Sequence, residues 1–263
     1  MRTALITGAS SGIGEEFARR LAARGHDLVL AARSEDKLHE LCDELMLKHK
    51  ITAHYFAVDL SQPNADALLY EETERHGFEI EWLINNAGYG SGGDFAVLDI
   101  EKELGIIDLN IRAVVALTHR YLKKMRERKS GTIINVSSAA SFQPIPFMAT
   151  YAASKAFVSS FTEAVAEENR PYGIRIMALC PGSTETNFFA ASDIDRAINM
   201  KGQQTAEEVV DTALAAIEKG KSKVVSGWSN FIAAVGATYM PNKITSRIIS
   251  KALRSRYQDQ KSK

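Results

Sequence analysis

The feature that most limits the fold is a regular alternation of short apolar runs with longer helical runs along the chain. Strands are expected at residues 3–7, 28–32, 52–58, 82–85, 132–136, 174–179 and 223–226. Helices are expected between them, at residues 12–24, 34–48, 64–76, 100–128, 150–169 and 205–219. Most of the strand segments are nearly continuous apolar runs, which is typical of parallel strands buried on both faces. The alternation therefore predicts an α/β fold, a doubly wound parallel sheet of seven strands flanked by helices.

The chain shows no sign of an internal domain boundary. It has 263 residues, which suits one large α/β domain, and no linker rich in Pro, Gly or Ser divides it. We expect one domain at residues 1–227, with residues 228–263 as a helical extension of that domain. The 32 basic and 32 acidic side chains cancel, so the overall charge gives no reason to expect a nucleic-acid partner.

Cysteine, histidine and hydropathy patterns argue against several other classes of protein. Cys42 and Cys180 form no CxxC pair, which predicts two buried thiols in a reducing, cytoplasmic environment. The 6 histidines are scattered, so no catalytic metal site is expected. The first residues suggest a strand rather than a signal peptide, and the longest mostly apolar stretch, residues 228–240, is too short to cross a bilayer.

A glycine-rich turn follows the first expected strand and opens the first expected helix. Residues 7–14 read TGASSGIG. Glycine is needed where a pyrophosphate approaches the main chain closely, because a Cβ atom would block the approach. The free N–H groups at the start of the following helix favour an anion. The turn is therefore predicted to bind a dinucleotide through Gly8, Ser10, Ser11, Gly12, Ile13 and Gly14.

The spacing of this turn, TGxxxGxG, resembles that of the short-chain dehydrogenase/reductase family, which has a single-domain Rossmann-like fold. Residues 85–88 match the family's NNAG motif, residues 151–155 its YxxxK motif, and residues 181–186 its PGxxxT segment. The resemblance covers about residues 3–226. No single motif is specific, but their joint occurrence in this order is.

The resemblance implies further contacts with the cofactor. Near the adenine, these are Asp59 and Leu60 after the third strand and the backbone of Asn86, Ala87 and Gly88. Near the nicotinamide, they are Pro181, Gly182, Thr184 and Thr186. From the residues alone, an Asp after a strand is also a common turn or helix-cap residue. Two asparagines and a glycine likewise form a good turn without any ligand.

The end of the second expected strand bears on the choice of nicotinamide cofactor. NAD sites usually place an Asp or Glu here to bind the ribose 2′-hydroxyl, but this chain has Ala32 followed by Arg33. A guanidinium binds a phosphate well, and a carboxylate would repel it. Arg33 can also be read as a solvated residue before a helix. The absence of an acid favours NADP(H) over NAD(H), as in the NADP-preferring members of the family.

Tyr151 and Lys155 are expected one turn apart on the same face of a helix. A nearby ammonium favours the phenolate, so Lys155 is expected to lower the pKa of Tyr151 and make it a better acid–base catalyst. Ser138 ends the fifth strand, where a hydroxyl can hydrogen-bond a carbonyl oxygen that gains negative charge. Ser137 is its neighbour, and only the family register selects Ser138.

The order Asn110, Ser138, Tyr151, Lys155 matches the family's four active-site positions. The resemblance implies that Asn110 holds a water in a proton relay and that Lys155 also binds the nicotinamide ribose. The alternative for Asn110 is a buried residue that satisfies a bulge in its helix. The implied activity is hydride transfer between NADP(H) and a carbonyl or secondary alcohol, with reduction of a ketone or a 3-oxoacyl group favoured.

Two other functions fit the same fold. An epimerase or dehydratase acting on a nucleotide sugar would be longer and would carry a separate substrate domain. A non-enzymatic dinucleotide sensor or scaffold would often have lost one of the four active-site groups, which are all present here. Both are disfavoured relative to a short-chain reductase.

The substrate and the assembly are the least constrained features. Residues 187–204 are expected to form a lid, with apolar lining from this segment and from Phe142, Ile145, Phe147 and Met148. A fatty, aromatic or steroid-like carbonyl and a 3-oxoacyl thioester are both candidate substrates. Family members usually pair through the fourth and fifth helices, which implies a homodimer or homotetramer.

The tail after residue 241 is basic and amphipathic. Packing on the body is its simplest role, and it can also cover the substrate pocket or contact a second subunit. Contact with an anionic membrane surface is the less favoured alternative.

Overall fold

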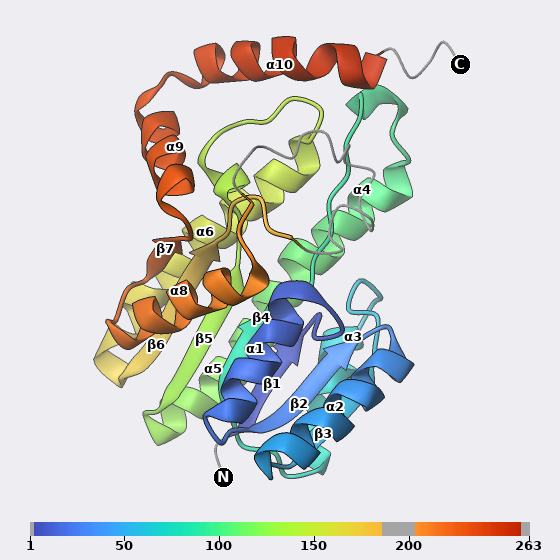
Figure 1. Cartoon of the computed structure of the whole chain (residues 1–263), viewed down its shortest axis with the longest axis vertical. Coiled ribbons are helices and arrows are strands. Elements are labelled where there is room, and N and C mark those ends of the chain that lie inside the picture. Colours follow the sequence, from blue (N-terminus) through green and yellow to red (C-terminus); the bar gives the residue numbers. More distant parts are fainter. Residues whose placement is uncertain (1–2, 186–202, 259–263) are drawn as a thin grey trace.

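The computed structural model of the chain describes residues 3–185 and 203–258 and shows one parallel sheet between two layers of helices (Figure 1). The strands are β1 (Thr3–Thr7), β2 (Asp27–Ala32), β3 (Ala53–Ala57), β4 (Ile80–Asn85), β5 (Gly131–Val136), β6 (Ile174–Cys180) and β7 (Lys223–Val225). Their order in the 7-stranded sheet is β3-β2-β1-β4-β5-β6-β7. Every neighbouring pair is parallel, which confirms the predicted fold class.

Helices cover both faces of the sheet. On one face lie α1 (Gly12–Ala23), α2 (Glu35–His49) and α8 (Ala206–Glu218), whose buried apolar side chains form one core with the strands. On the other lie α3 (Ala65–Arg75), α5 (Val114–Arg128) and α6 (Ala149–Asn169), which contribute to a second core. The two cores explain why the strand segments are apolar on both sides.

The strand order places a crevice at one edge of the sheet. From β1 the chain adds β2 and β3 on one side and then returns to add β4 to β7 on the other. At such a reversal the connections after β1 and β4 leave in opposite directions, and ligands bind at the carboxyl ends of these strands. Asn85, at the end of β4, donates from Nδ2 to Asn135 Oδ1 (2.8 Å) on β5 and to Thr118 Oγ1 (3.1 Å). This buried link stabilises the sheet next to the crevice.

The single helix expected at residues 100–128 is the main correction to the predicted elements. The structure divides it into α4 (Ile100–Ile107), a π-helical segment (Asp108–Ala113) and α5. A π-helical turn inserts one extra residue per turn, is rare, and is found mostly at functional sites. It contains Asn110, for which a bulge in the helix was one of the two readings of the sequence.

Two helices follow the last strand and reach over the carboxyl edge of the sheet. They are α9 (Trp228–Tyr239) and α10 (Asn242–Gln258), and α10 runs across the end of the molecule from α9 towards the loop before α4 (Figure 1). The α10 residue Tyr257 stacks on Phe147, with ring centroids 5.5 Å apart. The extension is thus helical, and its helices form a roof over the crevice.

Candidate active site

A cleft of about 930 Å³ opens at the carboxyl edge of the sheet and contains most of the residues predicted from the sequence. The predicted residues that line it are Gly8, Ser10, Ser11, Gly12, Ile13, Arg33, Asp59, Leu60, Asn86, Ala87, Gly88, Ser138, Tyr151, Lys155, Pro181, Gly182 and Thr184. Gly14 and Asn110 lie behind its wall. Thr186 falls outside the described residues, as does nearly all of the expected lid.

The glycine turn between β1 and α1 has the geometry of an anion site. Gly8 and Gly12 adopt φ values of +64° and +60°, which glycine reaches without strain. Ser11, the N-cap of α1, makes no side-chain capping hydrogen bond. The first N–H groups of α1 therefore remain available to a phosphate, and the residues present fit the pyrophosphate of a dinucleotide.

Gly14 and Asn86, two of the predicted cofactor residues, also hold the glycine turn in shape. A Cβ atom on Gly14 would collide with the carbonyl oxygen of Gly8 and with the Asn86 side chain. Asn86 Nδ2 donates to the carbonyl oxygens of Thr7 (3.0 Å) and Gly8 (3.1 Å). Thr7 Oγ1 in turn accepts from the backbone N–H of Asn86 (3.0 Å). Asn86 and Gly14 thus fix the shape of the turn that presents the other residues.

The residues expected to determine whether NADP(H) or NAD(H) binds lie at the end of the cleft next to β2. Ala32 ends β2, and the exposed Arg33 follows it with no hydrogen bond or ion pair to any other residue in the ranges 3–185 and 203–258. Asp59 Oδ1 accepts from Ser61 N (3.0 Å) and Ser61 Oγ (2.7 Å). Burial alone would raise the pKa of Asp59, but these hydrogen bonds and the positive charge of Arg33 hold it below its ordinary value.

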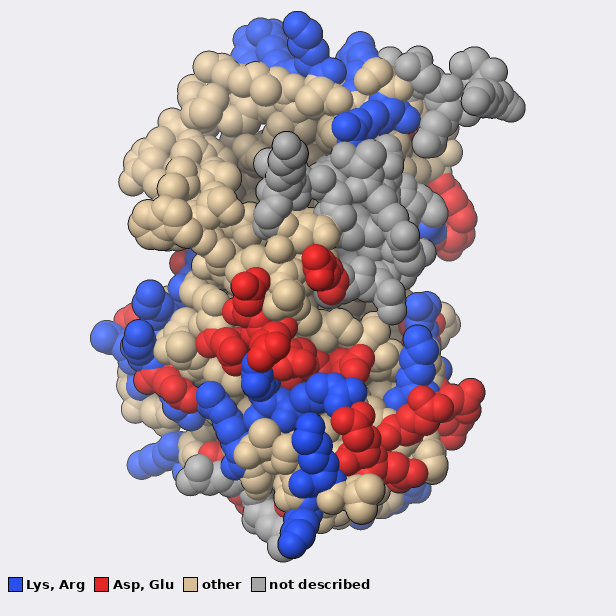
Figure 2. Space-filling model, viewed as in Figure 1, with Lys and Arg blue, Asp and Glu red and all other residues tan. Residues whose placement is uncertain are grey.

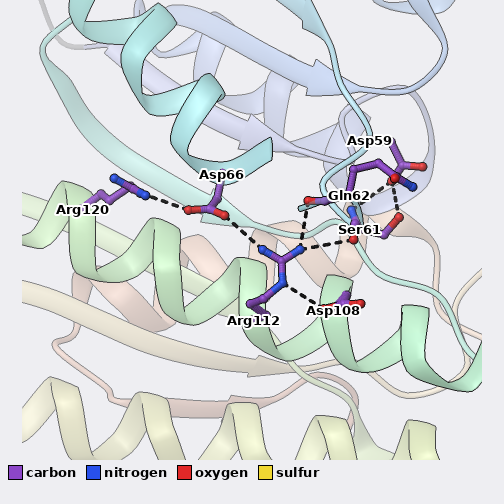
Figure 3. Close-up of polar contacts among 7 residues, drawn as sticks. All are labelled: Asp59, Ser61, Gln62, Asp66, Asp108, Arg112 and Arg120. Carbon is purple, nitrogen blue, oxygen red and sulfur yellow. Dashed lines mark hydrogen bonds and ion pairs between the residues drawn. The ribbon is translucent and has the colours of Figure 1, made fainter. Parts of the chain in front are cut away.

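Arg112 anchors the loop that carries Asp59, a role the sequence did not reveal (Figure 3). Its guanidinium donates to the carbonyl oxygens of Ser61 (3.2 Å) and Gln62 (3.0 Å). It also pairs with Asp66 Oδ1 at 3.2 Å. Because Arg112 lies in the same π-helical segment as Asn110, the segment connects the loop that carries Asp59 to the wall behind Tyr151 and Lys155.

The groups expected to be catalytic meet at the floor of the cleft. Tyr151 and Lys155 lie one turn apart on α6, both are buried, and Ser138 follows β5 directly opposite. The hydroxyl groups of Ser138 and Tyr151 share a hydrogen bond. The Ser137 hydroxyl instead donates to the carbonyl oxygen of Lys155 (2.7 Å). The geometry therefore favours Ser138 over Ser137 as the substrate-facing serine.

Burial controls the protonation of both Tyr151 and Lys155. It raises the pKa of Tyr151 to about 12, although the hydrogen bond with Ser138 acts in the opposite direction. It lowers the pKa of Lys155 to about 8. The expected lowering of the Tyr151 pKa by Lys155 is absent, because Lys155 Nζ lies 5.9 Å from the ring centroid and donates to Val136 O (2.9 Å). Tyr151 is consequently a neutral phenol, the form that donates a proton.

The titration of Lys155 predicts the pH dependence of reduction. When Tyr151 releases its proton, negative charge develops on its oxygen, and a charged Lys155 stabilises that charge. Because the lysine loses its charge as the pH rises through about 8, we expect kcat/KM for reduction to fall above that pH. The Lys155→Arg variant keeps its charge throughout, so its rate profile should lack this fall. An identical fall in both proteins would assign the titration to another group.

Asn110 is buried behind the cleft, and its side chain makes three hydrogen bonds. Its Oδ1 accepts from Tyr89 N (3.2 Å), and its Nδ2 donates to Tyr89 O (3.0 Å) and Ser154 Oγ (3.0 Å). A Cβ atom on Gly88 would lie 2.9 Å from Asn110 Oδ1 and 3.3 Å from Lys155 Nζ. Gly88 therefore lets both side chains approach the same point of the cleft wall.

A Gly88→Ala substitution tests this close approach. Asn110 cannot yield without losing hydrogen bonds, so we expect a stability loss of roughly 1–3 kcal/mol and a fall in turnover of at least about tenfold. Gly236→Ala on α9 is the matched control, because nothing lies within 4 Å of its added Cβ atom. Chemical denaturation and initial rates are measured for both variants. An unchanged turnover in Gly88→Ala would show that Asn110 and Lys155 can move away from the added Cβ atom without loss of activity.

The apolar half of the cleft comes largely from residues that the sequence did not single out. Ile145 and Met148 line it as expected, but Phe142 lies against Lys223 and Phe147 stacks on Tyr257. The remaining apolar walls belong to the roof helices: Ala233, Ala234 and Ala237 of α9, and Ile248, Ile249, Ala252 and Leu253 of α10. The alternative in which the tail covers the pocket is therefore the one the structure shows.

Other predicted features can be followed only through the described residues. Cys42 and Cys180 are free and buried, as predicted. In residues 3–185 and 203–258, no group of three or more His, Cys, Asp or Glu side chains is placed to hold a metal ion. None of the helices in the same ranges is both long and apolar enough to span a bilayer.

Comparison with known proteins agrees with this geometry. The family model for short chain dehydrogenases matches residues 2–197. A very-long-chain 3-oxoacyl-CoA reductase from Rattus norvegicus is 34% identical over 197 residues, which cover 73% of this chain and 60% of that protein. A short-chain dehydrogenase from Sphingobium yanoikuyae, solved in complex with NADPH, superposes with a TM-score of 0.81 at 32% identity and covers 90% of this chain and 93% of its own.

A second solved structure is similar over most of the chain. The bulky-bulky ketone specific alcohol dehydrogenase from Comamonas testosteroni has a TM-score of 0.77 at 30% identity, with 90% of this chain and 92% of that chain covered. The family model, the identities and the meeting of Ser138, Tyr151 and Lys155 beside an open glycine turn all agree. This chain belongs to the short-chain dehydrogenase family and is an oxidoreductase that uses a nicotinamide dinucleotide.

Proposed function

We propose that the chain is an NADP(H)-dependent reductase of carbonyl groups on bulky apolar molecules. One observation carries this proposal. The same cleft of about 930 Å³ reaches from Arg33, past Ser138 and Tyr151, to the apolar walls of α9 and α10. It thus offers a place for a dinucleotide phosphate, a proton donor and an apolar substrate in one continuous space.

The residues at the β2 end support NADP(H) rather than NAD(H). A carboxylate at the position of Ala32 would repel a 2′-phosphate, and the guanidinium of Arg33 forms no hydrogen bond or ion pair with the described residues. Ser10 and Ser34 line the same part of the cleft and can add hydrogen bonds to a phosphate. The solved relative from Sphingobium yanoikuyae, which holds NADPH, is consistent with this choice.

When bound, the reduced cofactor supplies the hydride, and the protein supplies position and the proton. Ser138 donates a hydrogen bond to the carbonyl oxygen as negative charge develops on it. Tyr151, a neutral phenol, gives its proton to the same oxygen. Lys155 stabilises the resulting charge and, by analogy with the family, binds the nicotinamide ribose. Asn110 is fixed by hydrogen bonds with Tyr89 and Ser154. It positions the water relay through which Tyr151 regains its proton.

The walls of the cleft favour a large apolar carbonyl compound. The alanines of α9 have small side chains and therefore leave space in the cleft for a bulky substrate. Ile248, Ile249 and Leu253 of α10 offer that substrate an apolar surface. The relatives named for 3-oxoacyl-CoA and for bulky ketones act on substrates of this general kind. Ketones with two large substituents and long-chain 3-oxoacyl thioesters are therefore the two substrate classes that we propose.

A comparison of kcat/KM across substrates of increasing apolar size distinguishes these classes from small polar substrates. We expect kcat/KM with NADPH to rise with substrate apolar surface, by roughly tenfold for each one or two buried methylene groups. A series of 3-oxoacyl thioesters of increasing length, run beside aryl ketones and keto sugars, measures this trend. Preference for a keto sugar would contradict the apolar assignment and leave the reductase assignment intact.

Assembly and location are part of the same proposal. The chain is expected to form a homodimer or homotetramer through α4, α5 and α6, by analogy with its family. The two buried free thiols fit a reducing, cytoplasmic compartment.

A further inference from the structure

Helix α9 is uncharged and presents an apolar side outward. It carries no charged residue over its 12 positions. Its inner side is made of small residues that line the cleft, among them Ala233 and Ala237. Its outer side is made of large ones: Trp228 is 77% exposed and Tyr239 is 84% exposed, with Phe231, Ile232 and Val235 exposed between them. A contiguous exposed apolar surface of this kind normally marks an interaction site.

Helix α10 continues this apolar surface and adds positive charge. Met240, Ile244 and Ile248 extend the exposed apolar residues of α9 onto α10. Asn242–Gln258 also contains five Lys or Arg residues and no Asp or Glu. Figure 2 shows the uncharged surface over α9 beside the cations along α10, at the same end of the molecule. We call these exposed residues of the two helices the α9–α10 surface.

The cations of the α9–α10 surface are not neutralised by the rest of the protein. Lys243, Arg247, Lys251, Arg254 and Arg256 are exposed, and none forms an ion pair with a residue in the ranges 3–185 and 203–258. The whole chain has a formal net charge of zero, so the positive charge is local to this end. A partner of complementary chemistry must therefore combine negative charge with an apolar layer.

We propose that the α9–α10 surface docks on an anionic lipid bilayer. Apolar side chains of α9 enter the interface, Trp228 and Tyr239 lie at the headgroup level, and the cations of α10 contact lipid phosphates. Aromatic residues with a polar end are typical of that depth in a membrane. With 12 residues, α9 is too short to span the bilayer and lies along it.

A second copy of the chain fits this surface less well. In a two-fold symmetric dimer the same patch meets itself, so the five cations of each α10 would face those of the other without any acidic partner on these helices. Like charges at an interface are unfavourable. The helices through which family members are expected to pair, α4 to α6, lie on other parts of the molecule.

The docked orientation places the cleft next to the lipid. Ile248 lines the cleft and is also 59% exposed on the α9–α10 surface. An apolar molecule dissolved in the bilayer would thus reach the cleft over apolar side chains. This consequence rests on the proposed function, whereas docking itself does not.

Vesicle flotation of the full-length protein tests the docking. Vesicles of phosphatidylcholine with phosphatidylglycerol are compared with vesicles of phosphatidylcholine alone. We expect flotation with the anionic vesicles that weakens in high salt. A Lys243→Glu/Arg247→Glu/Lys251→Glu variant should lose at least about 100-fold in vesicle affinity. A Phe231→Ser/Ile232→Ser/Val235→Ser variant should no longer float.

Matched controls place changes of the same kind elsewhere on the surface. Lys48→Glu/Lys219→Glu/Lys221→Glu reverses three other exposed charges, and Leu47→Ser/Leu68→Ser removes two other exposed apolar side chains. Both should float like the wild type. NADPH titration in solution checks that every variant is folded, since none of the changed residues lines the cleft. Failure of that titration in the wild type would count against the proposed function and not against docking.

Three results would overturn the docking proposal. The wild type fails to float with anionic vesicles, or the α10 charge-reversal variant floats as well as its control. Alternatively, light scattering shows a dimer that the α9 variant converts to monomers, with no vesicle binding by either protein. That last outcome would assign the α9–α10 surface to a second copy of the chain.

Discussion

The Tyr151→Phe variant is expected to lose carbonyl reduction by roughly 100- to 10,000-fold in kcat while it still binds NADPH. The substitution removes one oxygen atom from a side chain that lies at the floor of the cleft. The ring keeps its packing, so the shape of the cleft is preserved. What disappears is the proton donor and the hydrogen bond that it shares with Ser138.

Tyr121→Phe is the matched control for this variant. Tyr121 is equally buried, and its hydroxyl lies 2.8 Å from Thr73 Oγ1, outside the cleft that holds the catalytic groups. Its loss should cost about 1 kcal/mol of stability and leave kcat unchanged. Steady-state rates and NADPH titration are measured on both variants. If Tyr151→Phe retained its rate, the proton would have to come from another group, and the proposed role of Tyr151 would be wrong.

The second large effect is expected at Arg33. Loss of charge-assisted hydrogen bonds to a 2′-phosphate should weaken NADPH binding by roughly 10- to 100-fold in Arg33→Ala. NADH lacks that phosphate, so its affinity should change little. Ala32→Asp should act in the same direction and additionally favour NADH, because a carboxylate repels the phosphate and accepts from the ribose hydroxyls.

Arg170→Ala controls for the loss of a positive charge as such. Arg170 is a well-exposed arginine that pairs with Glu167 at 3.1 Å and does not line the cleft. Calorimetric titration of each variant with NADPH and NADH measures the ratio of the two affinities. An equal loss of affinity for NADPH and NADH in Arg33→Ala would mean that the arginine stabilises the site as a whole and does not bind the 2′-phosphate.

The sequence predicted those features of the site that depend on strand ends. The turn at Gly8, the Ala32–Arg33 pair, Asp59 and Ser138 each follow a strand of a parallel sheet, and such strands end at one common edge. Their meeting in one cleft therefore follows from the strand order. Tyr151 and Lys155 needed only helical spacing to be placed on one face of α6.

Other features depend on contacts between distant segments and were not predictable from local patterns. The tail was recognised as an amphipathic helix, but its position over the cleft rests on contacts such as that between Tyr257 and Phe147. The pKa of Tyr151 depends on how deeply the folded chain buries it, which spacing does not reveal. The division of the expected helix at residues 100–128 reflects the hydrogen bonds of Asn110 with Tyr89 and Ser154.

The role of Arg112 belongs to the same group. Its contacts with Ser61, Gln62 and Asp66 join segments roughly 50 residues apart along the chain. A sequence pattern offers no reason to connect an arginine in the middle of a helix with a loop after the third strand. The π-helical segment that carries both Arg112 and Asn110 makes this connection.

A single-turnover reduction tests the central claim most directly. The purified protein is saturated with NADPH and mixed with a bulky prochiral ketone, and the absorbance of the reduced nicotinamide is followed while the alcohol is analysed for chirality. We predict rapid loss of NADPH and one predominant enantiomer, with no such loss in Tyr151→Phe. Tight NADPH binding without oxidation by any ketone, aldehyde or 3-oxoacyl thioester would contradict the account and identify the chain as a dinucleotide sensor.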